Sequence, residues 1–533
     1  MPTGFFLDSV SSSRSYLFKF RLLVIVVLLL GILFRFINID HKIYWRDEAL
    51  TSLQVAGYTQ AEFVQQVFNG QILSPEYLQK YQQLNSEKTL GDTITALATE
   101  TPEHPPFYYI MLRFWMQHAG TSVAVIRSLS VFISLLVFPC IYWLCLELFE
   151  SPLVGGVAVA LIAVSPFHVV YAQEAREYSL WTVTTLLSGA ALLKALRVKT
   201  WVSWGIYSVT VALGLYSHVF FAFVLLGHSV YVFASSSFRL SKILISYMLV
   251  SVVGFLTFLP WIWTIISHLP EVHRSMYWTK VQASLPDLVK TWFSNLRLIF
   301  FDLEIPRFRI PFFSLFYFIV LCIAVLSGYS IYFLYSKTEK KVWLFVLTLI
   351  GITPLPLILP DLISGGIRST TPRYFIPFYL GIQLSVAHLF ATQTSSGKIP
   401  QQRTIWRIIM AIVISGGVIS CVSSSQAQVW WNKSPINNNI ELTHFINQAS
   451  RPLLISNNYA NNHNEILSLT YLLDPKVRIQ LVKFPDLPNI PNGFSDVFFY
   501  NPSGLAQEWQ EKLQRKYKVE AVKQFQNLWL LEK

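Results

Sequence analysis

Apolar runs of about 20 residues recur along most of this chain, and they limit its fold more than any other feature. Hydrophobic residues make up 53% of the 533 residues, and charged residues make up 13%. A soluble globular protein carries roughly 25% charged residues, so about half of that charge is missing. The pattern predicts a polytopic all-α membrane protein in which the apolar runs form helices that cross the bilayer.

Eleven transmembrane helices are predicted, and basic residues orient them. Arg14, Lys19 and Arg21 precede the first apolar run, so the amino terminus is expected in the cytoplasm. Arg35 follows that run where a signal peptide would have small residues, which favours an uncleaved span in the plasma (inner) membrane. An odd number of spans places the carboxyl-terminal segment outside. The predicted spans cover residues 19–37, 124–147, 153–170, 178–196, 203–219, 220–236, 243–266, 311–335, 342–360, 373–391 and 404–424.

The composition changes near residue 425, where Asn, Gln and Pro become common. We therefore predict a transmembrane domain at 1–424, which includes a first extracytoplasmic loop at 38–122, and a small extracytoplasmic α/β domain at 425–533. No catalytic motif stands out in the second domain. Its predicted strands cover residues 453–456, 477–482, 496–500 and 527–531, and a polar helix covers 506–517.

The net charge of +12 does not indicate nucleic-acid binding, because the Lys and Arg residues gather in short loops between spans. The four cysteines lie in apolar runs without the spacing of metal ligands, which argues against a zinc–thiolate site. The sequence also lacks the glycine patterns of Walker and Rossmann nucleotide sites.

Polar side chains able to do chemistry collect on the predicted outer side of the membrane. Charged groups are costly at a membrane surface, and loops that converge on one face commonly build the site of a helical membrane enzyme. These residues are Asp47 and Glu48 in the first loop, His104 near its end, Glu174, Arg176 and Tyr178 between the third and fourth spans, His218 between the fifth and sixth, and Arg373 and Tyr374 before the tenth.

Each of these residues also has a purely structural interpretation. Asp47 could cap the helix that follows it, because Asp is a favoured N-cap. His104 and the two prolines after it could form a rigid turn that opens a helix. Glu174 and its charged neighbours could be a solvated helix start, where carboxylates favour the positive end of the dipole. His218 could be a packing histidine, and Arg373 could extend toward lipid head groups.

Several segments together resemble the family 39 glycosyltransferases, which include protein O-mannosyltransferases and are related to the aminoarabinose transferases of lipid A. This family belongs to the GT-C superfamily of polyprenyl-phosphate-sugar transferases. The resemblance covers residues 20–235 and, beyond them, the Arg373-Tyr374 stretch. The segments that carry it are Asp47-Glu48, His104–Tyr109 (HPPFYY), Arg127, Ser165–Phe167 (SPF) and Gln173–Tyr178 (QEAREY).

The resemblance implies an inverting transfer of a sugar from a polyprenyl-phosphate donor to a hydroxyl of a lipid, glycan or protein acceptor. Asp47 would be the general base, and Glu48 would position the acceptor or the base. His104, Glu174 and Arg176 would complete the pocket. The lipid phosphate would be held by Arg373 with Tyr374, by His218 and by the Arg176–Tyr178 segment. A phosphate monoester leaving group does not strictly require a metal, so no obligatory cofactor is expected.

A divalent cation stays an alternative, because Asp47, Glu48, His104 and Glu174 could bind one if they converge. The chain also departs from known members. Aminoarabinose transferases usually have Lys in place of His104, and the loop at 267–310 is too short for the trefoil-type insert of many protein O-mannosyltransferases. The main alternative function is a transporter or flippase of polyprenyl-linked glycans.

Overall fold

The protein is described by a computed structural model that covers residues 4–236, 239–303, 310–396, 399–459, 462–501 and 507–532. The chain divides into two compact units, and each is built from several segments. The helical unit comprises Met1–Ile37, Glu103–Phe107 and Ser128–Gln426. The mixed unit comprises Asn38–Pro102, Tyr108–Arg127 and Ala427–Lys533.

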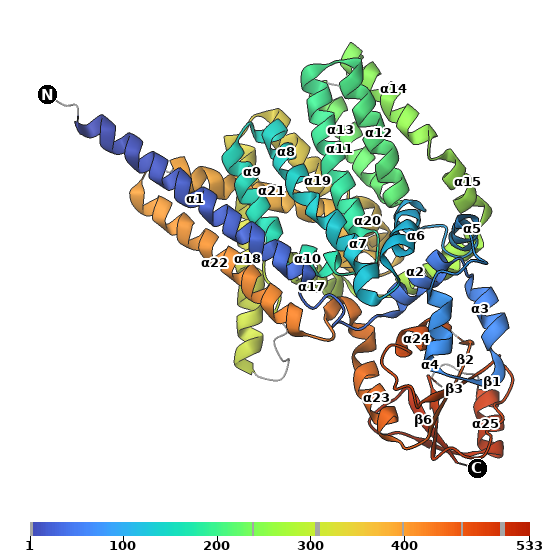
Figure 1. The fold of residues 1–533 in the computed structure, drawn as a ribbon. Helices are drawn as coiled ribbons and strands as arrows, with labels where there is room; N and C mark the ends of the chain where they lie inside the picture. Colours follow the sequence, from blue (N-terminus) through green and yellow to red (C-terminus); the bar gives the residue numbers. More distant parts are fainter. Residues whose placement is uncertain are drawn as a thin grey trace. The chain divides into compact units, whose positions relative to one another are not determined.

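The helical unit consists of long apolar helices joined by short turns (Figure 1). Helix α7 begins within the mixed unit and continues from Ser128. The helices are α1 (Gly4–Phe36), α7 (Val123–Leu135), α8 (Val137–Phe149), α9 (Pro152–Ala163), α10 (Pro166–Ala172), α11 (Tyr178–Val198), α12 (Trp201–Ser217), α13 (Phe221–Ser235), α14 (Lys242–Leu256), α15 (Leu259–Ser267), α16 (Leu269–Ser275), α17 (Leu285–Leu296), α18 (Ile310–Lys337), α19 (Lys340–Gly351), α20 (Leu355–Ser364), α21 (Ile376–Ser396) and α22 (Pro400–Gln426).

Among the described residues, five helices are long and apolar enough to cross a membrane, or up to eight if each bent pair is one span. The expected number of eleven is therefore not confirmed, although a multi-pass membrane protein is. Prolines explain the bent pairs, because proline lacks an N–H and stops the preceding helix. Pro166 opens α10 after a 61° bend from α9, and Pro260 lies in the first turn of α15 after a 52° bend from α14.

The mixed unit holds a sheet whose described part has six strands in the order β1-β3-β2-β4-β6-β5. The central pairs β3–β2 and β2–β4 are parallel, and the outer pairs are antiparallel. Its elements are α2 (Arg46–Ala56), α3 (Gln60–Val67), β1 (Asn69–Leu73), α4 (Pro75–Gln79), α5 (Leu90–Glu100), α6 (Phe107–Ala119), α23 (Asn437–Gln448), β2 (Pro452–Asn457), α24 (Asn462–Leu469), β3 (Arg478–Val482), β4 (Asp496–Tyr500), α25 (Gln507–Lys516), β5 (Lys518–Ala521) and β6 (Leu528–Glu532).

Apolar side chains cover both faces of this sheet, because successive residues of a strand point to opposite sides. Leu454 and Phe498 belong to a core shared with residues of α2, α3 and α24, whereas Leu453 and Phe499 belong to a core shared with α25. The central strands are therefore continuous apolar runs, as expected for strands buried on both faces.

Four predicted strands coincide with β2, β3, β4 and β6 to within one residue at each end. The predicted polar helix corresponds to α25, and its expected first residue, Ala506, lies outside the described residues. The first loop differs most from the expectation. Residues 69–73 of that loop form β1, which pairs with β3, so this loop and the carboxyl-terminal segment share one sheet.

Candidate functional site

The predicted site residues fall into two groups, one in each unit. Asp47 and Glu48 lie in the mixed unit. The other seven, His104, Glu174, Arg176, Tyr178, His218, Arg373 and Tyr374, lie in the helical unit.

Asp47 lies in the first turn of α2, where a carboxylate is favoured by the positive end of the helix. The N-cap is Trp45, so the interpretation of Asp47 as the helix cap is wrong. Its side chain is 25% exposed, and a carboxylate oxygen lies 3.6 Å from Nε of Arg46. An outside molecule can therefore reach this carboxylate.

Glu48, the next residue, has a side chain with no exposed surface. Nε and Nη2 of Arg127 donate to its two carboxylate oxygens, each at 2.8 Å. Nζ of Lys433 donates to Oε2 at 2.7 Å. Burial alone would raise the pKa of Glu48, but the two cations outweigh it and lower this pKa to about 2. Glu48 is thus a permanently ionised, inaccessible partner of two cations.

Arg127 carries the cluster further into the backbone before α2. Its remaining N–H groups donate to the carbonyl oxygens of Ile39 (2.8 Å), Lys42 (2.9 Å) and Ile43 (2.8 Å). All five guanidinium donors are therefore used, a geometry that lysine cannot reproduce. The three carbonyl dipoles also offset the second cation. The cluster fixes the chain between Ile39 and Glu48 as one rigid segment.

A second carboxylate, Glu465 of α24, lies on the other side of Asp47 in the sequence context of Arg46. Nη1 of Arg46 is 3.4 Å from Oε1 of Glu465. Burial raises the pKa of Glu465, Arg46 opposes this shift and the charge of Asp47 adds to it. The electrostatic coupling places the carboxylates of Asp47 and Glu465 in one acidic neighbourhood.

In the helical unit, His104 bridges two residues of the turn between α10 and α11. Its Nδ1 lies 2.9 Å from Oε1 of Glu177, and its Nε2 lies 3.0 Å from Nη2 of Arg176. Both contacts are satisfied when Nδ1–H donates to Glu177 and Nε2 accepts from Arg176. The prolines after His104 do open a helix, since α6 begins at Phe107, but the imidazole also joins this network.

Glu177 anchors this network from a fully buried position. Burial raises its pKa, but Arg176 and His104 outweigh this effect and hold the pKa of Glu177 well below its usual range. Glu174, three residues earlier, is also fully buried, and its carbonyl accepts the backbone N–H of Arg176 at 2.8 Å. The interpretation of this segment as a solvated helix start is therefore wrong.

Arg373 and Arg176 share an aromatic neighbour. The guanidinium carbon of Arg373 lies 5.7 Å from the ring centre of Tyr178 and 5.5 Å from that of Tyr374. The guanidinium carbon of Arg176 lies 6.0 Å from the Tyr178 ring. Cation–π contacts of this kind keep a guanidinium in place while its N–H groups stay available in the fork that suits a phosphate.

An ion pair orders the turn before Arg373. Asp361 of α20 accepts from Nη1 of Arg368 at 2.9 Å and from the backbone N–H of Ser369 at 2.6 Å. Gly366 has a φ of +136°, and a Cβ there would collide with Arg368 and Asp361. This position therefore requires glycine.

His218 stacks on Trp181, with ring centres 4.2 Å apart and planes at 13°. Its Nδ1 accepts the backbone N–H of Phe220 at 3.1 Å, so that nitrogen carries no hydrogen in this arrangement. These contacts are those of a neutral packing histidine, and they leave Nε2 as the donor atom.

Sequence reasoning missed Lys433, Glu465 and Glu177 as members of these groups and used Arg127 only to support the family resemblance. Arg127 carries a detectable signal, because a charge at the start of an apolar span must be paired. Lys433 and Glu465 lie in polar sequence, where one more charge is unremarkable, so no local pattern marks them.

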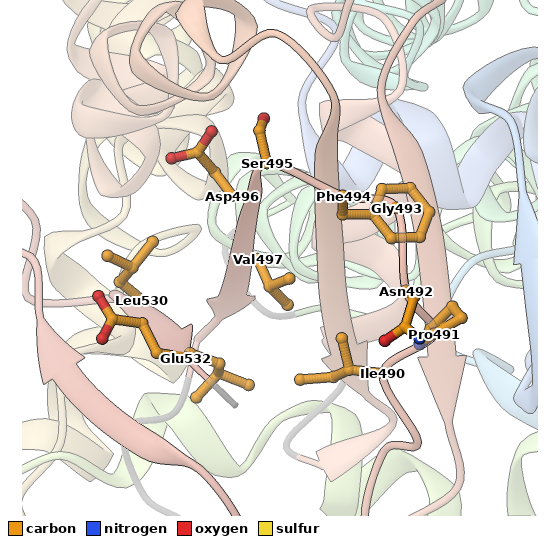
Figure 2. A pocket seen from close by; sticks show the side chains of 11 residues that line it. Ile490, Pro491, Asn492, Gly493, Phe494, Ser495, Asp496, Val497, Leu530 and Glu532 are labelled. Carbon is orange, nitrogen blue, oxygen red and sulfur yellow. The ribbon is translucent and has the colours of Figure 1, made fainter.

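Metal ligation has no candidate among the residues that the structure describes, where no group of three or more His, Cys, Asp or Glu side chains could hold an ion. A cavity of about 320 Å³ opens beside β4 and β6. Figure 2 shows the carboxylates of Asp496 and Glu532 on these neighbouring strands. None of the predicted site residues lines this cavity.

The fold and the two polar groups define a multi-pass membrane protein with buried arginine–carboxylate networks and an α/β unit. The family model for dolichyl-phosphate-mannose-protein mannosyltransferases matches residues 103–263. The resemblance to family 39 glycosyltransferases of the GT-C superfamily is thereby confirmed. No curated protein matches the chain.

Solved structures show the same fold at low sequence identity. The apo structure of ArnT from Cupriavidus metallidurans is 12% identical, with a TM-score of 0.51 over 98% of both chains. ArnT from the same organism bound to undecaprenyl phosphate is 11% identical, with a TM-score of 0.49 over 97% of this chain and 98% of that one. The apo oligosaccharyltransferase of Archaeoglobus fulgidus is 11% identical, with a TM-score of 0.48 over 85% of this chain and 64% of that one.

Proposed function

We propose that this protein is an inverting glycosyltransferase that moves a sugar from a polyprenyl-phosphate donor to a hydroxyl of a lipid, glycan or protein acceptor. The observation that carries the proposal is where the family match falls. Residues 103–263, matched by a family whose description names a dolichyl-phosphate sugar, contain the buried His104–Glu177–Arg176 network and Tyr178.

The proposed base is Asp47, because exposure separates the two adjacent carboxylates. Asp47 is 25% exposed and can meet an acceptor hydroxyl, whereas Glu48 is fully buried between Arg127 and Lys433. Asp47 accepts the hydroxyl proton as the oxygen attacks the anomeric carbon. Activation of a weak nucleophile by a positioned carboxylate typically accelerates such a step by about 10²–10⁴-fold. Glu48 acts as a positioning residue.

The leaving group is a lipid phosphate, which gains negative charge as the sugar–oxygen bond breaks. Arg176 and Arg373 are the cations proposed to neutralise that charge. Tyr178 and Tyr374 hold the Arg373 guanidinium, and Nε2–H of His218 is a further donor. His104 and Glu177 keep Arg176 in place. One displacement by one base inverts the anomeric centre.

We place the site on the extracytoplasmic side of the plasma (inner) membrane, as the distribution of basic loops predicts, with the amino terminus in the cytoplasm. A sugar carried across the bilayer by its lipid is then available where nucleotide sugars are not. No obligatory metal is proposed, and unchanged turnover in EDTA would support this.

The test is release of polyprenyl phosphate from radiolabelled donors by the purified protein in nanodiscs, with membrane extract as acceptor. Wild type should release lipid phosphate from at least one donor, and Asp47→Asn should lower the rate by about 10²-fold or more. Asp40→Asn, an exposed carboxylate in the same segment, is the matched control and should keep the wild-type rate. Donor binding without release by wild type would instead favour the flippase, to be tested by transport.

A further inference from the structure

The carboxyl-terminal segment binds the chain on both sides of Asp47. After it in sequence, Glu48 accepts from Nζ of Lys433 at 2.7 Å. Before it, Nη1 of Arg46 lies 3.4 Å from Oε1 of Glu465. Lys433 also donates to the carbonyl of Ile43 at 2.9 Å. The two residues that adjoin Asp47 are therefore each held by a side chain about 400 positions away in sequence.

The same segment also contacts the backbone just before α2. The hydroxyl of Ser468, on α24 with Glu465, donates to the carbonyl of Tyr44 at 2.6 Å. Tyr44 itself belongs to the core that the sheet shares with α24. Asp47 thus lies on a short stretch that is attached to α24 on one side and to Lys433 on the other.

We infer that the carboxyl-terminal segment positions the catalytic base, with Lys433 and Glu465 as positioning residues. This inference rests on the proposed function, in which Asp47 is that base. Neither residue has to touch the substrate: each acts on a neighbour of Asp47. The segment is therefore required for the chemical step itself, in addition to any role in acceptor recognition.

The two attachments differ in strength, and this difference makes the inference testable. The Lys433 and Glu48 side chains have 1% and 0% of their surface exposed, so their ion pair is shielded from water. The Arg46 and Glu465 side chains are 47% and 16% exposed, which weakens their attraction by solvent screening. Loss of Lys433 should therefore disturb Asp47 more than loss of Glu465.

The experiment measures kcat and KM of lipid-phosphate release for Lys433→Met and Glu465→Gln in nanodiscs. Lys433→Met should lower kcat by about 10- to 100-fold with little change in donor KM, because small displacements of a catalytic group cost this much. Glu465→Gln should lower kcat a few-fold. The matched controls are Lys476→Met and Glu511→Gln, exposed residues of the same segment, which should keep the wild-type rate.

A second background separates positioning from general damage. In Asp47→Asn protein, Lys433→Met should cause no further loss, because a residue that acts through the base has nothing left to position. An equal fractional loss in both backgrounds, or full activity of folded Lys433→Met, would overturn the inference alone. If Lys433→Met does not fold, Glu465→Gln decides: a rate equal to that of Glu511→Gln overturns the inference. Wild-type activity of Asp47→Asn would instead refute the proposed function.

Discussion

Replacement of Glu48 by glutamine removes the only carboxylate from a buried cluster that contains Arg127 and Lys433. The cations lower the Glu48 pKa from 4.5 to about 2. Because one pKa unit corresponds to about 1.36 kcal/mol, ionised Glu48 stabilises the fold by roughly 3 kcal/mol. This figure agrees with the roughly 3–5 kcal/mol lost when one partner of a buried ion pair is removed. Glu48→Gln should therefore be strongly destabilising at neutral pH.

The assay is thermal unfolding in nanodiscs, followed by tryptophan fluorescence, for wild type, Glu48→Gln and the control Glu76→Gln. Glu76 is exposed on α4 of the same unit, so its variant should unfold like wild type. A depressed pKa contributes stability above the unfolded-state value of 4.5, and this contribution is lost as the pH falls toward 2. The difference between wild type and Glu48→Gln should therefore be full at pH 7 and shrink below pH 4.5. Equal stability at pH 7, or a difference that does not shrink, would refute this reasoning.

Two further predictions concern the helical unit. Arg373→Lys keeps the charge but loses the planar fork between Tyr178 and Tyr374, so donor KM should rise by about tenfold in steady-state assays; an unchanged KM would exclude Arg373 from donor binding. Gly366→Ala places a Cβ against Arg368 at a φ of +136° and should displace the turn before Arg373. It should destabilise the protein by about 1–3 kcal/mol and weaken donor binding, and wild-type values for both in unfolding and binding assays would contradict this. Gly328→Ala, with open space around its Cβ position, is the control.

Sequence patterns predicted the elements that local chemistry specifies. Apolar runs located the helices, and the continuous apolar strands β2, β3, β4 and β6 were found because both of their faces are buried. Strands β1 and β5 were missed for the opposite reason. Their residues are mostly exposed, so neither shows an apolar alternation that would mark a strand.

The site was predictable where a residue type is unusual for its surroundings. Asp47, His104 and Arg176 attract attention because charged or titratable groups border apolar spans. The partners that set their roles were not predictable. Lys433 becomes significant only because folding brings it to Glu48, 385 positions away. The division of the two adjacent carboxylates into one exposed and one buried residue likewise depends on packing.

The measurement that tests the central claim most directly separates binding from chemistry in Asp47→Asn. It combines equilibrium binding of a labelled polyprenyl-phosphate sugar with single-turnover release of the lipid phosphate, both with protein in nanodiscs. If Asp47 is the base, the variant binds the donor with the wild-type Kd and releases lipid phosphate about 10²-fold more slowly or worse. Wild-type release by Asp47→Asn, or a weakened Kd that accounts for the whole loss, would contradict a base at Asp47.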